Sequence, residues 1–407
     1  MKRIVILCDG TWNRSDSETP TNVVRFAQAM KGIDSHGIVQ VPIYVQGVGT
    51  GRGPTKLSRK MDSWLGGGLG WGLMANIEEA YRHLVFLWEP GDEIYVIGFS
   101  RGAYTARSLT GFIRSTGIVD RNALSRVPEA IKRYRTMEDD TTHPSSDESH
   151  AFRAEMSPRV VTSPKEAAWR AARGLPEAPL LRIDYLGVWD SVGALGVPAH
   201  IPVLGRLTAR RYRFHDADLS SMVRSARHAV ALDERRRTFT PTRWTNVAEL
   251  NEGHVSEDEP PYQELFFAGD HGSVGGGGDI TALSSIGLEW VIQGARQAGL
   301  EFDAKRLQEI RQEQDHMGPL RNTTEPLTGA LNWFMHRDPV DRDGPSTIEE
   351  LHPTALARWQ AEAKSETFVS YRPGSLARIH DRLLEHHRET MFAQVDQNTD
   401  EGDPRQS

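Results

Sequence analysis

One serine in this sequence has the surroundings of a catalytic nucleophile. Ser100 is the centre of Gly98 to Gly102, a Gly-x-Ser-x-Gly pattern that follows the β-branched and aromatic run 94–99. A helical pattern begins at Ala103, so the segment predicts a strand, a sharp turn and a helix. Gly98 and Gly102 leave room for such a turn, which raises the serine hydroxyl above the edge of the sheet. The pattern therefore predicts nucleophilic attack by Ser100, with a merely tight strand–helix turn as the alternative.

A serine nucleophile needs a base within hydrogen-bond reach and an acid that orients the base. Asp190 closes the predicted strand 180–188, which predicts its carboxylate at the carboxyl edge of the sheet, where open α/β proteins place their sites. His271 follows the strand-like segment 264–267 and precedes a run of four glycines. The sequence therefore predicts Ser100, Asp190 and His271 as a catalytic triad, in an order that hydrolases use.

Two of these assignments have alternatives in the same sequence. His352 is the rival base, although Pro353 favours an extended backbone at that position and a capping role for its ring. Asp190 has an ordinary cap of a helix or turn as its alternative role. Position favours His271, because it alone directly follows a buried-looking strand downstream of Asp190 and enters a glycine-rich loop.

An oxyanion that forms during acyl transfer needs two backbone N–H donors. One is expected from Arg101, the residue after the nucleophile, and the other from Gly10 or Thr11, which follow the first strand. Asp9 is expected to brace this loop through its carboxylate, with an ordinary Asx turn as the alternative.

The elements that must position these residues alternate between strand and helix patterns. The predicted strands are 4–7, 39–45, 94–99, 180–188 and 264–267, and the predicted helices are 23–30, 73–88, the segment from 103, 164–174, 220–232 and 285–298. This alternation predicts an α/β fold with a mostly parallel central sheet and helices on both faces. Pro42 places the second strand at an edge, and residues 47–72 are expected to form a long loop.

The domain prediction is one α/β domain interrupted by an insertion. Residues 1–135 and 180–390 are assigned to the domain, and 398–407 to a disordered tail. The insertion is 136–179, an acidic and polar segment that contains a capped helix. It is the predicted lid over the site.

Composition excludes several classes of protein. The 407 residues carry a net charge of −7, which argues against nucleic acid as the main partner. The single cysteine, Cys8, excludes an internal disulfide. No apolar run approaches the roughly 18 residues that span a bilayer, and the chain starts in a strand instead of a signal peptide. The sequence therefore predicts a protein that is cytoplasmic as synthesised, with export only by a non-classical route.

Other binding motifs are weaker or missing. Residues 70–75 match the dinucleotide pattern Gly-x-Gly-x-x-Ala, but no strand precedes them. The sequence has no Walker loop, no His-Glu-x-x-His pair and no cysteine pair, so neither a metal nor an organic cofactor is expected. A nucleotide-binding enzyme that uses the glycine-rich loops stays an alternative, as does a binding or regulatory module that keeps the fold without turnover.

Taken together, these blocks resemble a known family. The chain is similar to the bacterial uncharacterised α/β-hydrolase domains that include phospholipase effectors of type VI secretion. The matching blocks are Asp9-Gly10-Thr11, Gly98 to Ala103, Gly187 to Val192, Ala231 to Arg236, His271, Val274 to Gly277 and Tyr371-Arg372-Pro373. The resemblance implies an α/β-hydrolase-like fold and gives Ser100, Asp190 and His271 the triad roles.

The function expected from the sequence is serine hydrolysis of carboxylic esters through an acyl-enzyme. The resemblance implies lipid or phospholipid esters as substrates, with transient contact at a membrane surface. No particular oligomeric state is indicated by the sequence.

Overall fold

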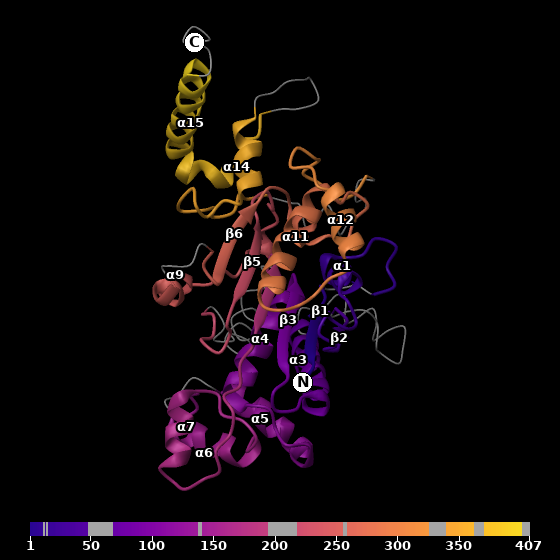
Figure 1. The fold of residues 1–407 in the computed structure, drawn as a ribbon, viewed down its shortest axis with the longest axis vertical. Helices are drawn as coiled ribbons and strands as arrows, with labels where there is room; N and C mark the ends of the chain where they lie inside the picture. Colours follow the sequence, from indigo (N-terminus) through magenta and orange to yellow (C-terminus); the bar gives the residue numbers. More distant parts are fainter. Residues whose placement is uncertain are drawn as a thin grey trace, which may run out of the picture.

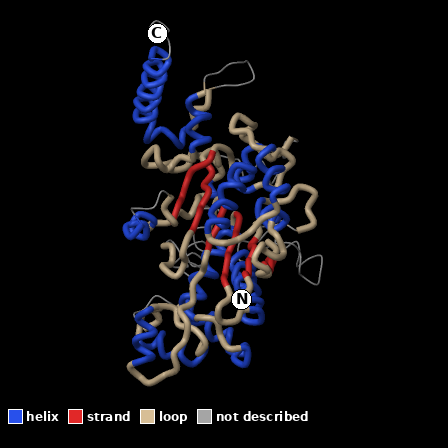
Figure 2. The backbone as a smooth tube through the Cα atoms, viewed as in Figure 1, coloured by secondary structure: helices blue, strands red, loops and turns tan. Residues whose placement is uncertain are grey.

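A six-stranded parallel β-sheet organises this protein. The computed structural model describes residues 1–10, 13, 15–47, 68–136, 141–193, 218–254, 259–324, 339–361 and 370–400. The strands lie in the order β2-β1-β3-β4-β5-β6, and every neighbouring pair is parallel. They are β1 (Arg3–Cys8), β2 (Gln40–Val45), β3 (Glu93–Phe99), β4 (Tyr185–Trp189), β5 (Ala226–Ala231) and β6 (Tyr262–Phe267). Figure 2 shows this group of strands flanked by helices, so the predicted α/β class is confirmed.

Helices cover both faces of the sheet, and the chain also forms helices outside these two layers. The described helices are α1 (Asn22–Ala29), α3 (Gly68–Leu87), α4 (Arg101–Thr116), α5 (Val127–Arg135), α6 (Asp147–Met156), α7 (Pro164–Ala171), α9 (Val247–Asn251), α10 (His271–Gly275), α11 (Ala282–Gln297), α12 (Ala304–Gln312), α14 (Pro353–Gln360) and α15 (His380–Asp400). Short 3-10 turns are η1 (Arg121–Arg126), η2 (Arg237–Phe239), η3 (Glu252–His254) and η4 (Gly374–Ile379). Figure 1 gives their arrangement.

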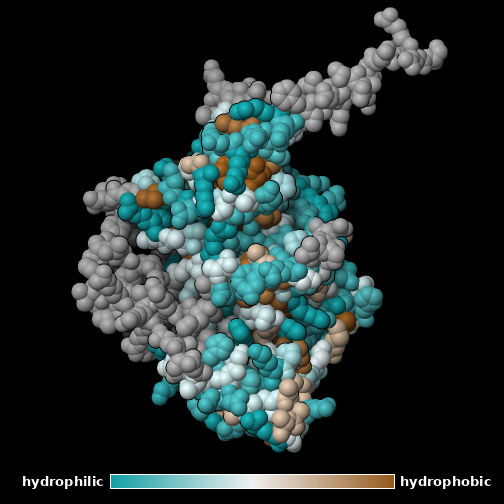
Figure 3. Space-filling view, turned by 90° about the vertical axis from the view of Figure 1, so that its left-hand side faces the viewer, coloured by the Kyte–Doolittle hydropathy of each residue, from teal (hydrophilic) through white to brown (hydrophobic). Residues whose placement is uncertain are grey.

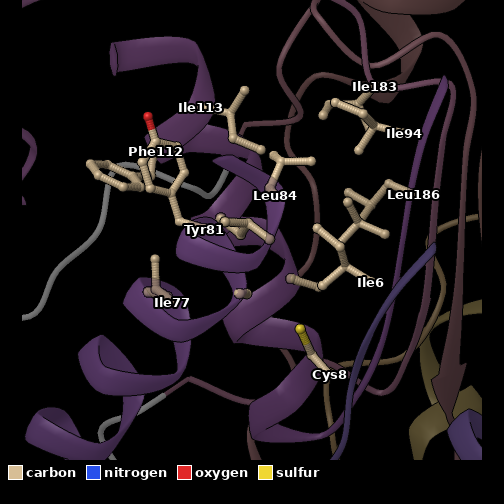
Figure 4. Close-up of a cluster of buried hydrophobic side chains, with 14 of the residues drawn as sticks. Ile6, Cys8, Ile77, Tyr81, Leu84, Ile94, Phe112, Ile113, Ile183 and Leu186 are labelled. Carbon is tan, nitrogen blue, oxygen red and sulfur yellow. The ribbon is translucent and has the colours of Figure 1, made fainter. Parts of the chain in front are cut away.

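The two faces of the sheet form two separate cores because successive side chains of a strand point to opposite faces. Ile4 and Ile6 of β1 pack with residues of α3 and α4. Val5 and Leu7 pack with residues of α1 and α11 on the other face. Figure 4 shows the first of these cores, in which the rings of Tyr81 and Phe112 lie 4.6 Å apart. A strand covered on both faces reads as a continuous apolar run, which is why β1 was predictable.

The strand register brings the ends of β1, β3 and β4 to one edge. Cys8 pairs with Gly98, and Phe99 pairs with Trp189. Ser100 and Asp190 therefore leave the sheet side by side, at its carboxyl edge.

A third core attaches the C-terminal part of the chain to the far edge of the sheet. Phe266 of β6 donates its N–H to the carbonyl of Glu350 at 2.8 Å and accepts the N–H of His352 at 2.9 Å. The buried members of this core are Val230, Leu232, Phe266, Ala268, Leu351, Ala355, Trp359, Tyr371, Leu376, Ile379 and Leu383. Figure 1 shows α14 and α15 beside the end of β6, so this edge strand is covered by later parts of the chain.

Several predicted elements differ from the structure, among them the strand predicted at 180–188, which is Tyr185–Trp189. The predicted helix 220–232 is wrong, since Ala226–Ala231 forms strand β5, which is buried along its whole length between β4 and β6. The predicted loop 47–72 ends earlier than expected because helix α3 begins at Gly68, while residues 48–67 lie outside the described part.

The inserted segment packs far from the nucleophile. Its described part, 136 and 141–179, contains α6 and α7. A buried carboxylate, Glu166, bonds the guanidinium groups of Arg153 and Arg170 at 2.7 Å each. Arg153 and Ser157 donate to the carbonyls of the last two residues of α4, at 3.2 and 2.7 Å. Helix α4 has 16 residues and is therefore about 24 Å long, with Ser100 at its other end. The described part of the insertion thus packs at the end of α4 opposite Ser100. Its role as a lid and the domain boundaries stay predictions.

No helix in the described ranges is both long and apolar enough to cross a membrane. On the face shown in Figure 3, hydrophobic residues form small separate areas within a mostly hydrophilic surface.

Helix α15 continues to Asp400, so the predicted disordered tail cannot begin at 398. Residues 401–407 lie outside the described residues.

Candidate active site

Ser100 occupies a strained turn between β3 and α4. Its φ of 59° and ψ of −126° are unusual for a residue other than glycine. A Cβ at Gly98 would lie 2.6 Å from the carbonyl oxygen of Gly102, and a Cβ at Gly102 would overlap the backbone of Cys8 and Asp9. Both flanking glycines are needed because β3, α4 and the end of β1 approach one another closely, which is the geometry that the motif predicts.

The structure brings together the three residues of the predicted triad. His271 Nε2 lies 2.8 Å from Ser100 Oγ, and His271 Nδ1 lies 2.5 Å from Asp190 Oδ2. A carboxylate only accepts hydrogen bonds, so Nδ1 carries the proton and Nε2 is free to accept the hydroxyl hydrogen of Ser100. All three side chains are buried. The arrangement suits removal of the Ser100 proton as Oγ attacks a carbonyl carbon.

His271 begins the short helix α10 and is held on several sides. The ring lies between two aromatic neighbours, with centroid distances of 4.7 Å to Phe99 and 4.8 Å to Phe239. Its backbone N–H donates to the Glu234 carboxylate at 3.3 Å. A Cβ at Gly275 would overlap the Phe99 ring, so the glycine run that follows the histidine allows α10 to pack directly on the turn before Ser100.

Asp190 is fully buried and surrounded by donors. Its φ is 37°, and Oδ1 accepts the N–H of Ala231 at 3.0 Å. Arg342 donates to both carboxylate oxygens, from Nη1 at 2.7 Å and from Nη2 at 2.9 Å. Burial alone would raise the pKa of Asp190, but the charge of Arg342 and the hydrogen bond from His271 outweigh it and hold that pKa well below its usual range. The carboxylate therefore stays ionised at neutral pH.

A second polar chain fixes the backbone just after Asp190. The Ser191 N–H donates to His228 Nε2 at 3.1 Å, and His228 Nδ1 donates to Glu264 at 2.8 Å. Glu264 also accepts from Arg243 at 2.7 Å. His228 comes from β5 and Glu264 from β6, whereas Arg243 lies between η2 and α9. None of the three was among the predicted site residues because nothing local marks them.

The three residues predicted to donate backbone N–H groups to an oxyanion differ in what the structure shows of them. The Gly10 N–H donates to the Asp9 carboxylate at 2.7 Å, so Gly10 is not a free donor, contrary to its predicted role. Thr11 lies outside the described residues. The Arg101 N–H stands at the first position of α4, where helix geometry leaves it without an intrahelical acceptor.

The Asp9 carboxylate is bonded on several sides. It accepts the Thr21 hydroxyl at 2.9 Å and the Tyr44 hydroxyl at 2.7 Å, and burial raises the pKa of Asp9. These bonds tie the end of β1 to β2 and to the start of α1. Gly10 itself lies against the nucleophile, since a Cβ there would be 3.2 Å from the Ser100 Cβ.

The competing motifs occupy other positions. His352 is the N-cap of α14, with Nδ1 2.8 Å from the Thr354 hydroxyl and its ring stacked on Phe267 at 4.3 Å. Burial, with the charge of Arg227, lowers the pKa of His352 to about 4. Residues 70–75 lie inside helix α3 and form no turn of the dinucleotide-binding kind. Within the described ranges, no cluster of three or more His, Cys, Asp or Glu residues has a geometry that holds a metal ion.

Comparisons with known proteins identify relatives of this chain. A family described as T6SS, phospholipase effector Tle1-like, catalytic domain matches residues 2–294. The Uncharacterized protein YEL023C of Saccharomyces cerevisiae is 27% identical over 246 residues, which are 58% of this chain and 32% of that protein. The chain thus spans about a third of the length of this curated relative.

Two solved structures show weak likeness. An uncharacterized protein from Pseudomonas aeruginosa has a TM-score of 0.37 and 16% identity, with 77% of this chain and 48% of that chain covered. The Tle1 effector bound to the VgrG spike from the type 6 secretion system has a TM-score of 0.35 and 15% identity, with 69% and 52% covered. Likeness of this strength supports no conclusion about function.

The family match, unlike the likeness to these two structures, supports a conclusion. It covers well over half of the chain and includes β1 to β6 and the positions of Ser100, Asp190 and His271. This chain therefore belongs to the family of Tle1-like phospholipase effectors of the type VI secretion system, as defined by their catalytic domain.

Proposed function

We propose that this protein is a serine hydrolase that cleaves carboxylic esters of lipids or phospholipids. The observation that carries the proposal is the continuous hydrogen-bonded chain from Ser100 Oγ through His271 to Asp190, with separations of 2.8 and 2.5 Å. Membership of a phospholipase effector family supports a lipid substrate. Export as a type VI effector and transient contact with a membrane surface belong to the same proposal.

The reaction starts with attack on the ester carbonyl. Ser100 Oγ forms a bond to the carbonyl carbon while its proton moves to His271 Nε2. The negative charge that develops on the carbonyl oxygen is stabilised by N–H donors, of which Arg101 supplies one at the helix start. Asp190 stabilises the imidazolium and keeps its Nδ1 proton directed away from Ser100.

The intermediate then collapses to an acyl-enzyme. The carbon–oxygen bond to the alcohol breaks, and His271 returns the proton to the leaving oxygen. In the second half, His271 takes a proton from water, whose oxygen attacks the acyl carbon. The bond to Ser100 Oγ then breaks, His271 returns the proton to Oγ, and the fatty acid is released. The same base thus serves both halves without a cofactor in the proposed scheme.

Labelling with a fluorophosphonate probe tests this proposal directly. Only a serine with an activated hydroxyl reacts, so wild type should be labelled at Ser100 and Ser100→Ala should not. Hydrolysis of short esters, long esters and phospholipid vesicles would then define the substrate. A folded wild-type protein that neither reacts with the probe nor releases acid from any ester would refute the proposal in favour of a binding module.

A further inference from the structure

We propose that Arg342 is a positioning residue for the catalytic acid, and that the chain beyond residue 339 therefore completes the active site. The inference rests on the proposed ester hydrolysis, and it deepens that proposal by assigning a role to a residue outside the family match of 2–294. Arg342 acts through Asp190 and is not expected to touch the substrate.

Arg342 and Asp190 form a buried, bidentate ion pair. The exposed fractions of the two side chains are 5% and 0%. Besides the two bonds to the carboxylate, Arg342 donates to the carbonyl of Ala231 at 2.9 Å and to that of Phe239 at 2.5 Å. The planar guanidinium therefore fixes the carboxylate to backbone on both sides of it, at the end of β5 and in η2.

This geometry determines which carboxylate oxygen faces the histidine. Oδ1 accepts from the Ala231 N–H and from Nη1, whereas Oδ2 accepts from Nη2 and from His271. With Arg342 removed, the carboxylate keeps, among donors in the described ranges, the Ala231 N–H and His271. It would then be free to rotate about χ2, and the imidazole would lose its fixed orientation towards Ser100.

The guanidinium also balances the charge on Asp190. A buried carboxylate without this partner would draw a proton more strongly onto His271, and a protonated imidazole cannot act as base. Removal of Arg342 should therefore make hydrolysis require higher pH. Further charged groups near this pair in the described ranges are Glu234, which interacts with His271, and Arg236, which interacts with Asp190 and Asp270. Glu234 and Arg236 pair with each other at 2.6 Å, which leaves Arg342 as the direct counter-ion of Asp190.

The same part of the chain also supports the loop that carries the histidine. Tyr371 donates its hydroxyl to the Asp233 carboxylate at 2.7 Å, and Asp233 accepts the N–H of Gly269 at 2.6 Å. Gly269 lies two residues before His271. The C-terminal region therefore contacts the supports of both the acid and the base, while the third core holds it on β6.

The test compares Arg342→Met and Arg342→Lys with wild type and with Arg235→Gln. Arg235 forms an ion pair with Asp341 at 2.8 Å on the same segment, but both side chains are about half exposed and neither bonds Asp190. We expect Arg342→Met to lower kcat about 100-fold with little change in KM, and to move the acidic limb of the pH profile upwards. Arg342→Lys should have a kcat between those of Arg342→Met and wild type, because it keeps the positive charge but lacks the planar guanidinium that bonds both carboxylate oxygens. Arg235→Gln should behave as wild type.

Two measurements separate this proposal from a loss of folding and from failure of the proposed function. The far-downfield proton resonance of His271 Nδ1 reports its bond to Asp190 without any turnover, and it should weaken or shift in Arg342→Met. In an Asp190→Asn background, removal of Arg342 should have little further effect on kcat, because its target is already neutral. An unchanged resonance together with an unchanged pH profile in folded Arg342→Met would overturn the role of Arg342, even where wild type proves to be an active esterase.

Discussion

Ser100 and Asp190 are neighbours across two parallel strands, and both have positive φ, at 59° and 37°. They follow the paired residues Phe99 and Trp189, and the Ser100 N–H donates to the Trp189 carbonyl at 3.0 Å. Positive φ is uncommon for residues other than glycine and costs about 1 kcal/mol or more at each position. The described residues show no other case outside glycine. Backbone strain in this part of the chain is thus confined to two members of the proposed triad.

Replacement of the nucleophile should separate catalysis from folding. Ser100→Ala should lower kcat by about 10⁴-fold or more, because the acyl-enzyme can no longer form. Alanine has the same Cβ as serine and meets the same strain at φ 59°, so the melting temperature should stay near that of wild type. Ester turnover and thermal unfolding of the same sample check both points. A well-folded variant with full activity would exclude Ser100 as the nucleophile.

The glycine after the nucleophile should be essential for packing. In Gly102→Ala the added methyl overlaps the backbone of Cys8 and Asp9, which cannot move without displacing β1. We expect a loss of about 1–3 kcal/mol in the free energy of unfolding and a large loss of activity. Gly32→Ala is the matched control, because no atom lies within 4 Å of the added methyl. Chemical denaturation should show that control within about 0.5 kcal/mol of wild type; equal stability of the two variants would contradict the packing argument.

Local patterns were sufficient for the elements that carry the nucleophile. The apolar runs of β1 and β3 are buried on both faces, and Gly98 and Gly102 mark the tight turn between β3 and α4. The same patterns indicated the family, which the comparison confirmed. Strand β5 was missed because Ala226–Ala231 is rich in alanine, a residue that favours helices. There the position between β4 and β6 overrides local propensity.

Contacts between distant segments could not be predicted in this way. Arg342 lies 152 residues from Asp190, and no motif marks it in the sequence. Gly10 was expected to donate to an oxyanion, but a carboxylate one residue away takes its N–H. Both cases depend on which partner a polar group finds in three dimensions, which spacing along the chain does not define.

The two candidate bases should respond differently to truncation. His271→Ala should lower kcat by orders of magnitude, because Ser100 Oγ loses the base that lies 2.8 Å away. His352→Ala should leave kcat near wild type and instead lower the free energy of unfolding by about 1 kcal/mol, since it removes the N-cap of α14. Turnover at saturating substrate and urea denaturation distinguish these effects. If His352→Ala were the inactive variant, the base would have to be reassigned.

His352 should also make stability depend on mildly acidic pH. Burial and the charge of Arg227 lower the pKa of His352 from 6.5 to about 4. Between these values the unfolded chain binds a proton that the folded chain does not, so this contribution to stability is complete above about pH 6.5 and is lost as the pH falls towards about 4.

The matched comparison is wild type against His352→Gln, which has no titrating ring. We expect the free energy of unfolding of wild type to fall more between about pH 7.5 and about pH 5 than that of the variant, because both share every other titrating group. Urea denaturation at the two pH values measures the difference. Parallel losses in the two proteins would mean that His352 titrates alike in the folded and unfolded chains, and that its ring on Phe267 is not shielded from water.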